Sequence, residues 1–408
     1  MADPPKRNVK ELLAESKDTS ELMVDLAYAA LFFSDPKLVR EVDRLEERMN
    51  QYSYDLRVIT MLAARSREDA EALTDVLHLA SCIEQIADAA VGISHVVTDV
   101  VAIPTALRAD LTHADEISGR VRVRGGSSCV GRTLEELEIP TETGMWVIAI
   151  RRGSDWDFEP HGDSVLGEDD VLLIRGPEEG IRLIRQMAGA PVSEQPDDEG
   201  QQLTEADGRA WPELDRAVDI LVAMKNAAEV SVGLAYSALM LRERALAAEV
   251  TTLESKSDEL QSELESWVLR ATENAPNVEE LRGLLRLAYA SEAICDAARS
   301  MTRLVDRGED LHPIVAEAIE ASDAVAVSDI VEPGSIADGK TLKELSFKTE
   351  TGMVALAIQR NGRWIYRPPA RFMLLAGDRV IATGPEDGEE EIDALVKAPM
   401  PAETSATA

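Results

Sequence analysis

The amino-acid sequence consists of two similar copies, one after the other. Leu26-Ala-Tyr-Ala-Ala-Leu31 returns as Leu234-Ala-Tyr-Ser-Ala-Leu239, and Thr141-Glu-Thr-Gly-Met145 returns as Thr349-Glu-Thr-Gly-Met353. Both pairs lie 208 residues apart, so no net insertion separates the copies between these motifs. A period this long indicates a duplicated set of domains rather than a solenoid of short repeats. A site that both halves use is therefore expected to occur in both.

The charge of the chain restricts its partners. It has 76 Asp and Glu against 42 Lys and Arg, a net charge of −34. Nucleic-acid binding needs a basic face, so we expect no nucleic-acid partner. Such acidity is typical of a cytosolic protein from a high-salt organism. Molar salt shortens the Debye length to ~3 Å, so the repulsion between the negative charges of the chain is tolerated there. The start of the sequence has no apolar signal region, and the longest apolar stretch, Val232 to Leu241, is too short to span a bilayer. We expect a soluble, cytoplasmic protein.

Each copy divides into a helical block and a small α+β domain. In the first copy, apolar residues recur every three or four positions, with breaks near Ser34–Pro36, Tyr52–Tyr54 and Arg67–Asp69 that indicate three helices. The following region contains short strands at Met145–Ile150, Trp156–Pro160 and Val171–Ile174, and helices at Leu134–Leu137 and Glu178–Ala188. The expected boundaries are an N-terminal extension at 1–19, helical blocks at 20–104 and 212–312, α+β domains at 108–190 and 313–398, an acidic linker at 191–211 and a disordered tail at 399–408.

Two acidic pairs are repeated on the helices. Glu84 and Asp88, like Glu292 and Asp296, lie one turn apart and face the same side of a helix. This spacing suits a hard cation, or an iron or zinc cluster, if a neighbouring helix adds oxygen ligands. Candidate partners in the first copy are Asp43, Glu46 and Glu47. In so acidic a chain, the alternative is a solvated or salt-bridged pair, and it is left open.

A third pattern resembles a nucleotide-binding loop. Gly334 to Thr341 matches the Gly-x-x-x-x-Gly-Lys-Thr motif, which needs a long helix directly after it. Here only the short stretch from Thr341 to Phe347 follows as a possible helix before the next expected strand, and the first copy has Arg132 in place of Lys340. A turn before a short helix explains both copies better than an NTPase. No grouping of nucleophile, base and oxyanion donors is evident, so we expect no enzyme activity.

The α+β domains resemble the TrkA-C domain, the C-terminal regulatory domain of RCK proteins. The residues that carry the resemblance are Gly339-Lys-Thr-Leu342, Gly352 to Arg360, Pro368 and Gly377-Asp378. The first copy has Asp169-Asp170 in place of Gly-Asp. The resemblance implies that such domains pair and bind cyclic di-AMP or cations. The implied ligand-binding residues are Ile150, Arg152, Pro160, Ile358, Arg360 and Pro368. No Gly-x-Gly-x-x-Gly fingerprint is present, so NAD is not expected.

The helical blocks resemble the three-helix repeats of PhoU, a phosphate-signalling regulator. Asp55-Leu-Arg57 followed by Glu84 and Asp88 is similar to that family's acidic metal-binding motifs, whereas the second copy has Glu263-Leu-Glu265 at the first of them. The expected fold is thus mixed: PhoU-like helical bundles alternate with small α+β TrkA-C domains. The resemblance implies a regulatory subunit of a membrane cation transporter or channel, for potassium, that senses a small ligand. The alternatives are a PhoU-type metal-binding regulator of phosphate transport and a scaffold without a ligand; a homodimer is a further expectation.

Overall fold

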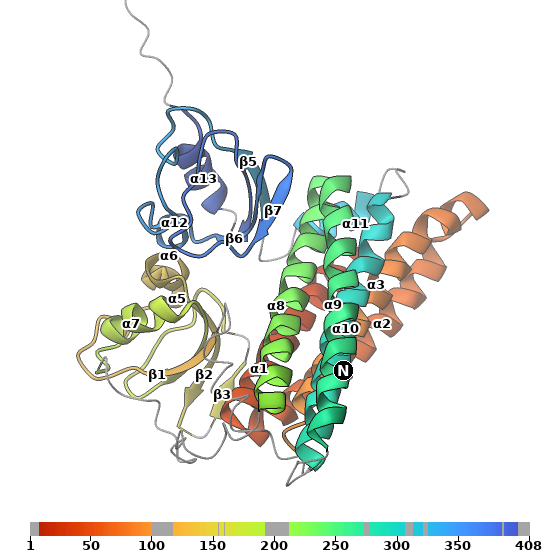
Figure 1. Cartoon of the computed structure of the whole chain (residues 1–408), viewed down its shortest axis with the longest axis horizontal. Coiled ribbons are helices and arrows are strands. Elements are labelled where there is room, and N and C mark those ends of the chain that lie inside the picture. Colours follow the sequence, from red (N-terminus) through yellow and green to blue (C-terminus); the bar gives the residue numbers. More distant parts are fainter. Residues whose placement is uncertain are drawn as a thin grey trace, which may run out of the picture. The chain divides into compact units, whose positions relative to one another are not determined.

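The computed structural model of the chain describes residues 8–99, 117–153, 155–158, 160–191, 212–272, 278–306, 313–320, 325–385 and 387–398. It falls into two compact units (Figure 1). The first unit comprises 1–139 and 145–322, and the second comprises 140–144 and 323–408. The expected linker and tail lie almost entirely outside the described residues.

The first helical domain is a bundle of three helices. They are α1 (Val9–Phe33), α2 (Pro36–Ala63) and α3 (Arg67–Ser94). Ser34 takes up the left-handed conformation that ends α1, and Asp35 caps α2, whose first residue is Pro36. Ser66 caps α3 by accepting a hydrogen bond from the Asp69 backbone. The three helices pack against one another along their apolar faces.

The second helical domain repeats this arrangement. It consists of α8 (Pro212–Leu241), α9 (Arg244–Ala271) and α10 (Val278–Asp306), followed by α11 (Pro313–Glu320). The two bundles meet where α3 packs against α10. A Cβ built on Gly92 of α3 would lie 3.7 Å from the Cβ of Ala290 in α10, so small side chains let the two helices approach closely. Six helices therefore share one core (Figure 1).

The helix boundaries differ from the expected ones in several places. Helix α1 begins at Val9, inside the region expected to be an extension, because Asn8 and Glu11 form a capping box. The expected break at Tyr52–Tyr54 does not occur, since these residues lie within α2 with Tyr52 and Ser53 buried. Helix α11, expected in the second α+β domain, packs against α1 instead, with Val315 and Ala318 buried. The expected helix end at Pro104 lies outside the described residues.

Each α+β domain is built on a four-stranded antiparallel sheet. The first sheet has the order β1-β4-β2-β3, with β1 (Ile117–Arg122), β2 (Trp146–Arg152), β3 (Asp155–Asp157) and β4 (Val171–Gly176). Its helices are α5 (Leu134–Leu137), α6 (Ile139–Thr143) and α7 (Glu178–Met187). Strands β2 and β4 and helices α5 and α7 occur where the sequence predicts them, whereas β1 was not anticipated.

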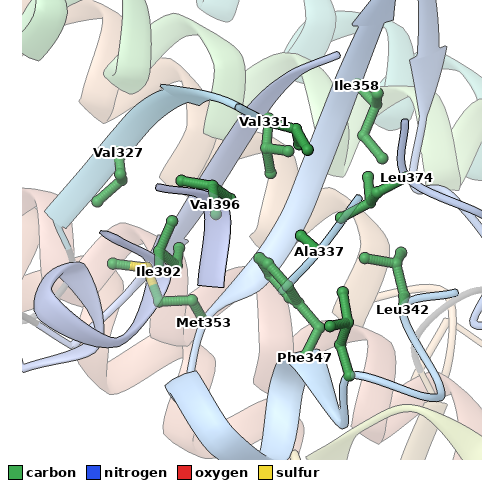
Figure 2. Packing of buried hydrophobic residues seen from close by; sticks show 13 residues of the cluster. Val327, Val331, Ala337, Leu342, Phe347, Met353, Ile358, Leu374, Ile392 and Val396 are labelled. Atoms are coloured by element: carbon green, nitrogen blue, oxygen red, sulfur yellow. The ribbon is translucent and has the colours of Figure 1, made fainter. Parts of the chain in front are cut away.

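The second sheet repeats the topology in the order β5-β8-β6-β7. Its elements are β5 (Val325–Ile330), α12 (Phe347–Thr351), β6 (Val354–Arg360), β7 (Arg363–Tyr366), β8 (Arg379–Gly384) and α13 (Gly388–Val396). Figure 2 shows Met353, Phe347 and Ile392 from its separate segments meeting in one apolar core. The expected mixed fold, with helical bundles alternating with small α+β domains, is confirmed.

One helix among the described residues, α3, is long and apolar enough to cross a membrane by length and composition. More than half of its apolar window, 56%, is buried inside the protein. It packs against α1, α2 and α10. The core helix of a bundle has the same length and composition, and α3 occupies that position here.

Candidate functional site

The arginine at the end of β2 is bound to a buried aspartate next to the neighbouring strand. Arg152 donates from Nε to Asp170 Oδ1 at 2.9 Å and from Nη2 to Asp170 Oδ2 at 2.7 Å. Nη2 also donates to the carbonyl oxygen of Val165 at 2.9 Å. The Asp170 side chain is only 1% exposed, so Arg152 supplies the positive charge that a buried carboxylate needs.

The second copy repeats this fork. Arg360, which ends β6, donates from Nε to Asp378 Oδ1 at 2.7 Å and from Nη2 to Asp378 Oδ2. Nη2 also donates to the carbonyl oxygen of Met373 at 2.6 Å, the counterpart of the Val165 contact. Its guanidinium lies 4.8 Å from the centre of the Phe372 ring. The two copies therefore share one arrangement, here named the strand-end clamp: Arg152 with Asp170, and Arg360 with Asp378.

The aspartate of each clamp also organises the turn before the last strand. Asp170 Oδ2 accepts from the Gly167 backbone at 2.7 Å, and Asp378 Oδ2 accepts from the Leu375 backbone at 2.8 Å. Burial alone would raise the pKa of Asp170, but the hydrogen bonds from Arg152 and Gly167 and the charge of Arg152 lower it below its ordinary value. Asp169 has a φ of +68°, the conformation that Gly377 takes with +91°, so the departure from Gly-Asp in the first copy preserves the turn.

The six implied ligand residues are in unlike environments. Ile150 and Ile358 point into the apolar cores of their domains, and Figure 2 shows Ile358 among the core side chains. Pro160 and Pro368 are half-buried. Each clamp arginine uses Nε and Nη2 inside its own domain, and Nη1 has no hydrogen-bond partner among the residues that the structure describes. The Nη1 group of each arginine is therefore available to a ligand. Binding of a ligand there stays a prediction.

The first acidic pair has a cation beside it. Glu84 Oε2 accepts from Arg57 Nη2 at 2.8 Å and from Ser53 Oγ at 2.8 Å, so α2 neutralises this carboxylate. Burial and the neighbouring Glu84 charge raise the pKa of Asp88. The expected partner Asp43 instead shares a hydrogen bond of 2.7 Å with His95.

The second acidic pair lacks that cation. Glu265 stands at the position of Arg57, one repeat later. Burial raises the pKa of Glu292 most, and together with the charge of Asp296, the hydrogen bond with Asp296 and the charges of Asp258 and Glu254 it brings that pKa to about 7. Burial and the neighbouring carboxylates thus favour the protonated form of Glu292, and a bound cation would offset both effects.

No assembled metal centre is present in the described part of the chain. None of its His, Cys, Asp and Glu side chains form a group of three or more that is able to hold a metal ion. The pairs Glu84 with Asp88 and Glu292 with Asp296 are therefore incomplete as they stand, and the role predicted for them needs ligands from water or side-chain movement.

The segment that resembles a nucleotide-binding loop is a set of turns. No long helix follows it: Thr341 and Glu344 cap each other across one turn, and α12 has only five residues. An N-terminus with aligned backbone N–H groups is thus not available to hold phosphates.

The sequence motifs pointed to the arginines of the clamp but not to its aspartates as functional partners. Both aspartates follow their arginine by 18 positions, in both copies. That repeated spacing was the signal in the sequence that could have linked them.

Comparisons with known proteins give matches to two domain families. The TrkA-C domain model matches residues 119–189 and 327–397, and the PhoU domain model matches residues 13–97 and 221–305. Each family therefore occurs twice, in alternation, at the spacing of the sequence repeat. No curated protein matches the sequence.

Similar solved structures are distant. PhoU from Pseudomonas aeruginosa is 14% identical with a TM-score of 0.39, over 74% of this chain and 96% of that one. The GsuK channel bound to NAD is 15% identical with a TM-score of 0.18, over 79% and 65% of the two chains. The GsuK RCK domain is 14% identical with a TM-score of 0.17, over 79% and 78%.

Proposed function

We propose that this chain, a tandem duplication of a PhoU domain followed by a TrkA-C domain, is a regulatory subunit of a membrane cation transporter or channel. Both domain families are regulatory and non-catalytic, and their combination in one chain is the observation that carries the proposal. Potassium is the proposed cation. The protein acts in the cytoplasm and reaches the membrane through its partner.

The TrkA-C domains are the proposed sensors, with cyclic di-AMP as the ligand. The two strand-end clamps support this, because each keeps an arginine at the end of a strand with the Nη1 edge directed to no described protein group. Arginine recognises phosphate through two N–H groups in one plane. The bonds from Nε and Nη2 to the aspartate hold the plane of the guanidinium group in place before a ligand binds.

The test is calorimetric titration of cyclic di-AMP into the full chain in high-salt buffer. A simple Arg152→Ala change would leave Asp170 buried and unpaired, so loss of binding could reflect loss of the fold. The informative variant is R152A/D170N/R360A/D378N, which removes both partners of each clamp. Its matched control is D170N/D378N, which keeps the arginines. We expect the control to bind and the fourfold variant to bind at least about tenfold more weakly, a loss of ~1.4 kcal/mol.

Two outcomes would contradict the sensor proposal. Absence of binding by the wild type removes cyclic di-AMP as the ligand, and equal binding by both variants moves the site away from the arginines. Circular dichroism of each variant shows whether the domains are folded.

A second candidate function is a metal-dependent regulator of phosphate transport. The observation that favours it is the pairing of Glu292 with Asp296 one helical turn apart, where burial and the charges of neighbouring carboxylates raise the pKa of Glu292 to about 7. A divalent cation would be held by Glu292 and Asp296 with water as the remaining ligands. Calorimetry with Mn²⁺ on the wild type and on E292Q/D296N tests it, and E84Q/D88N is the matched change in the first repeat. Equal weak binding by all three proteins would contradict a site at the second pair.

A further inference from the structure

The first TrkA-C sheet is joined to the first helical domain by two ion pairs. Arg175 of β4 donates from Nη1 to Asp25 Oδ1 of α1 at 2.5 Å. Arg120 of β1 donates from Nη2 to Asp35 Oδ2, before α2, at 2.6 Å. The Asp25 and Asp35 side chains are only 10% and 19% exposed, so salt screens these pairs much less than pairs at the surface.

Arg120 makes further contacts on both sides of this junction. Its guanidinium lies 4.3 Å from the centre of the Phe33 ring at the end of α1 and 5.7 Å from the centre of the Trp156 ring in β3. Asp35 is at the same time the cap of α2, because its Oδ1 accepts from the Lys37 backbone at 2.9 Å. Arg120 therefore contacts the turn between α1 and α2 as well as the edge strand of the sheet.

The second repeat has lost these groups. It has Ser328 in place of Arg120, Thr383 in place of Arg175 and Gly233 in place of Asp25. The two hydroxyl groups bond inside their own sheet: Ser328 Oγ accepts from Arg379 Nε at 2.8 Å, and Thr383 Oγ1 donates to the Val325 carbonyl at 2.9 Å. The same two ion pairs are chemically impossible with these residues.

We propose that Arg120 and Arg175 form a one-sided latch, by which the first TrkA-C domain moves as one body with α1 and α2. Domains in one chain move relative to one another unless a sufficient interface holds them. On the helical side, the two arginines bind Asp25 of α1 and Asp35, the capping residue of α2. A displacement of the sheet is therefore transmitted to both helices. The latch does not depend on which ligand the protein senses.

The test measures the distance between the two joined domains in the full chain. Spin labels are placed at the exposed residues Arg40 of α2 and Arg182 of α7, after changing each to cysteine. The natural cysteines, Cys82, Cys129 and Cys295, are buried and are replaced by the alanine that the other repeat carries at each position. Pulsed electron spin resonance then gives the distribution of label distances.

The latch variant is R120S/R175T, which introduces the residues of the second repeat. We expect the width of the distance distribution to roughly double relative to the parent protein. The control is R132S, an exposed arginine whose contacts stay within its own domain, and it leaves the width unchanged. The triple variant D25N/R120S/R175T also neutralises the buried Asp25 carboxylate that has lost Arg175, and it gives a second measurement should the double variant fail to fold.

A charge exchange completes the design. R175D alone sets two carboxylates against each other and widens the distribution, whereas D25R/R175D restores a pair of opposite charges and narrows it again. Parent-like widths in the double and triple variants overturn the latch, and so does an exchange that fails to narrow the distribution. Since no ligand is added, failure of the latch leaves the proposed function standing, and failure of the proposed function leaves the latch.

Discussion

Lys17 of the first repeat lies over the ring of Tyr236 in the second, with 5.0 Å between Nζ and the ring centroid. Its counterpart Lys225 lies over Tyr28 of the first repeat at the same distance. Each lysine also pairs with a glutamate one turn further along its own helix, Glu21 at 3.1 Å and Glu229 at 2.6 Å. Each half thus supplies an aromatic ring to an ion pair of the other half, and this exchange joins the two bundles.

Removing these lysines is expected to weaken the six-helix core. The Lys17 and Lys225 side chains are 4% and 6% exposed, and their loss takes the ion-pair lysine away from Glu21 and Glu229. We expect K225A to lower the free energy of unfolding by about 3 kcal/mol, and K17A by less, because Glu21 is the more exposed partner. Urea denaturation measures both. Lys37→Ala, at an exposed position, changes the value by no more than about 0.5 kcal/mol, and an equal effect of all three would contradict the buried pairs.

The strand-end clamp is expected to make the first TrkA-C domain sensitive to acid. The folded pKa of Asp170 lies below its ordinary value of 3.8, so its stabilising contribution is complete above that value. The contribution is lost as the pH falls through the lower folded pKa. Melting temperatures between pH 2 and 6 should therefore fall less steeply for D170N than for the wild type. The exposed neighbour Asp169 is the control, and a D169N profile that matches D170N would refute the assignment.

Glu292 gives a pH dependence of the opposite sign. Its folded pKa is about 7, above the ordinary value of 4.5, so the folded state binds more protons between these values. The stability of the second PhoU domain should then decline as the pH rises from about 4.5 to about 7. Denaturation midpoints across this range test it, and E292Q should remove the decline.

A matched variant tests the cause assigned to this shift. E265R places an arginine at the position where the first repeat has Arg57 beside Glu84. A nearby cation lowers the pKa of a carboxyl group, so the decline should flatten in E265R as well. The variant also removes the hydrogen bond from Tyr289 to Glu265, which Y289F removes alone. If the stability of E292Q still declines as the pH rises, the decline does not originate at Glu292.

The loop from Gly334 to Thr341 is expected to hydrolyse no nucleotide. Its match to a phosphate-binding motif is not followed by the helix that such a motif needs. We expect phosphate release from ATP and GTP at the buffer background for both wild type and K340A. Activity that disappears in K340A would reverse this interpretation.

The repeat made the domain organisation predictable, because each ambiguous segment could be compared with its counterpart 208 residues away. The first strand of the first sheet was missed because Ile117–Arg122 carries a glycine and two arginines, and its alternation is visible only once burial is known. The break expected at Tyr52–Tyr54 rested on local propensity, and packing of Tyr52 and Ser53 inside the bundle overrides it.

The candidate sites were harder to predict than the fold. The sequence locates Arg152 at a strand end, but only the antiparallel pairing of β2 with β4 brings Asp170 into reach. Likewise, helical spacing places Glu84 and Asp88 on one face, yet it does not reveal that Arg57 comes from α2 to neutralise one of them. Contacts between elements depend on topology, which a single sequence specifies only through the whole fold.

The latch between Arg175 and Asp25 has a consequence for how such a protein can evolve. Two identical subunits that pair must carry every substitution twice, so an ion pair that arises on one side of the axis arises on the other side as well. A single polypeptide that contains both halves is free of this restriction. Here one half has Asp25 and the other has Gly233, so only the first half can form this ion pair. A symmetric dimer of identical subunits cannot differ between its halves in this way.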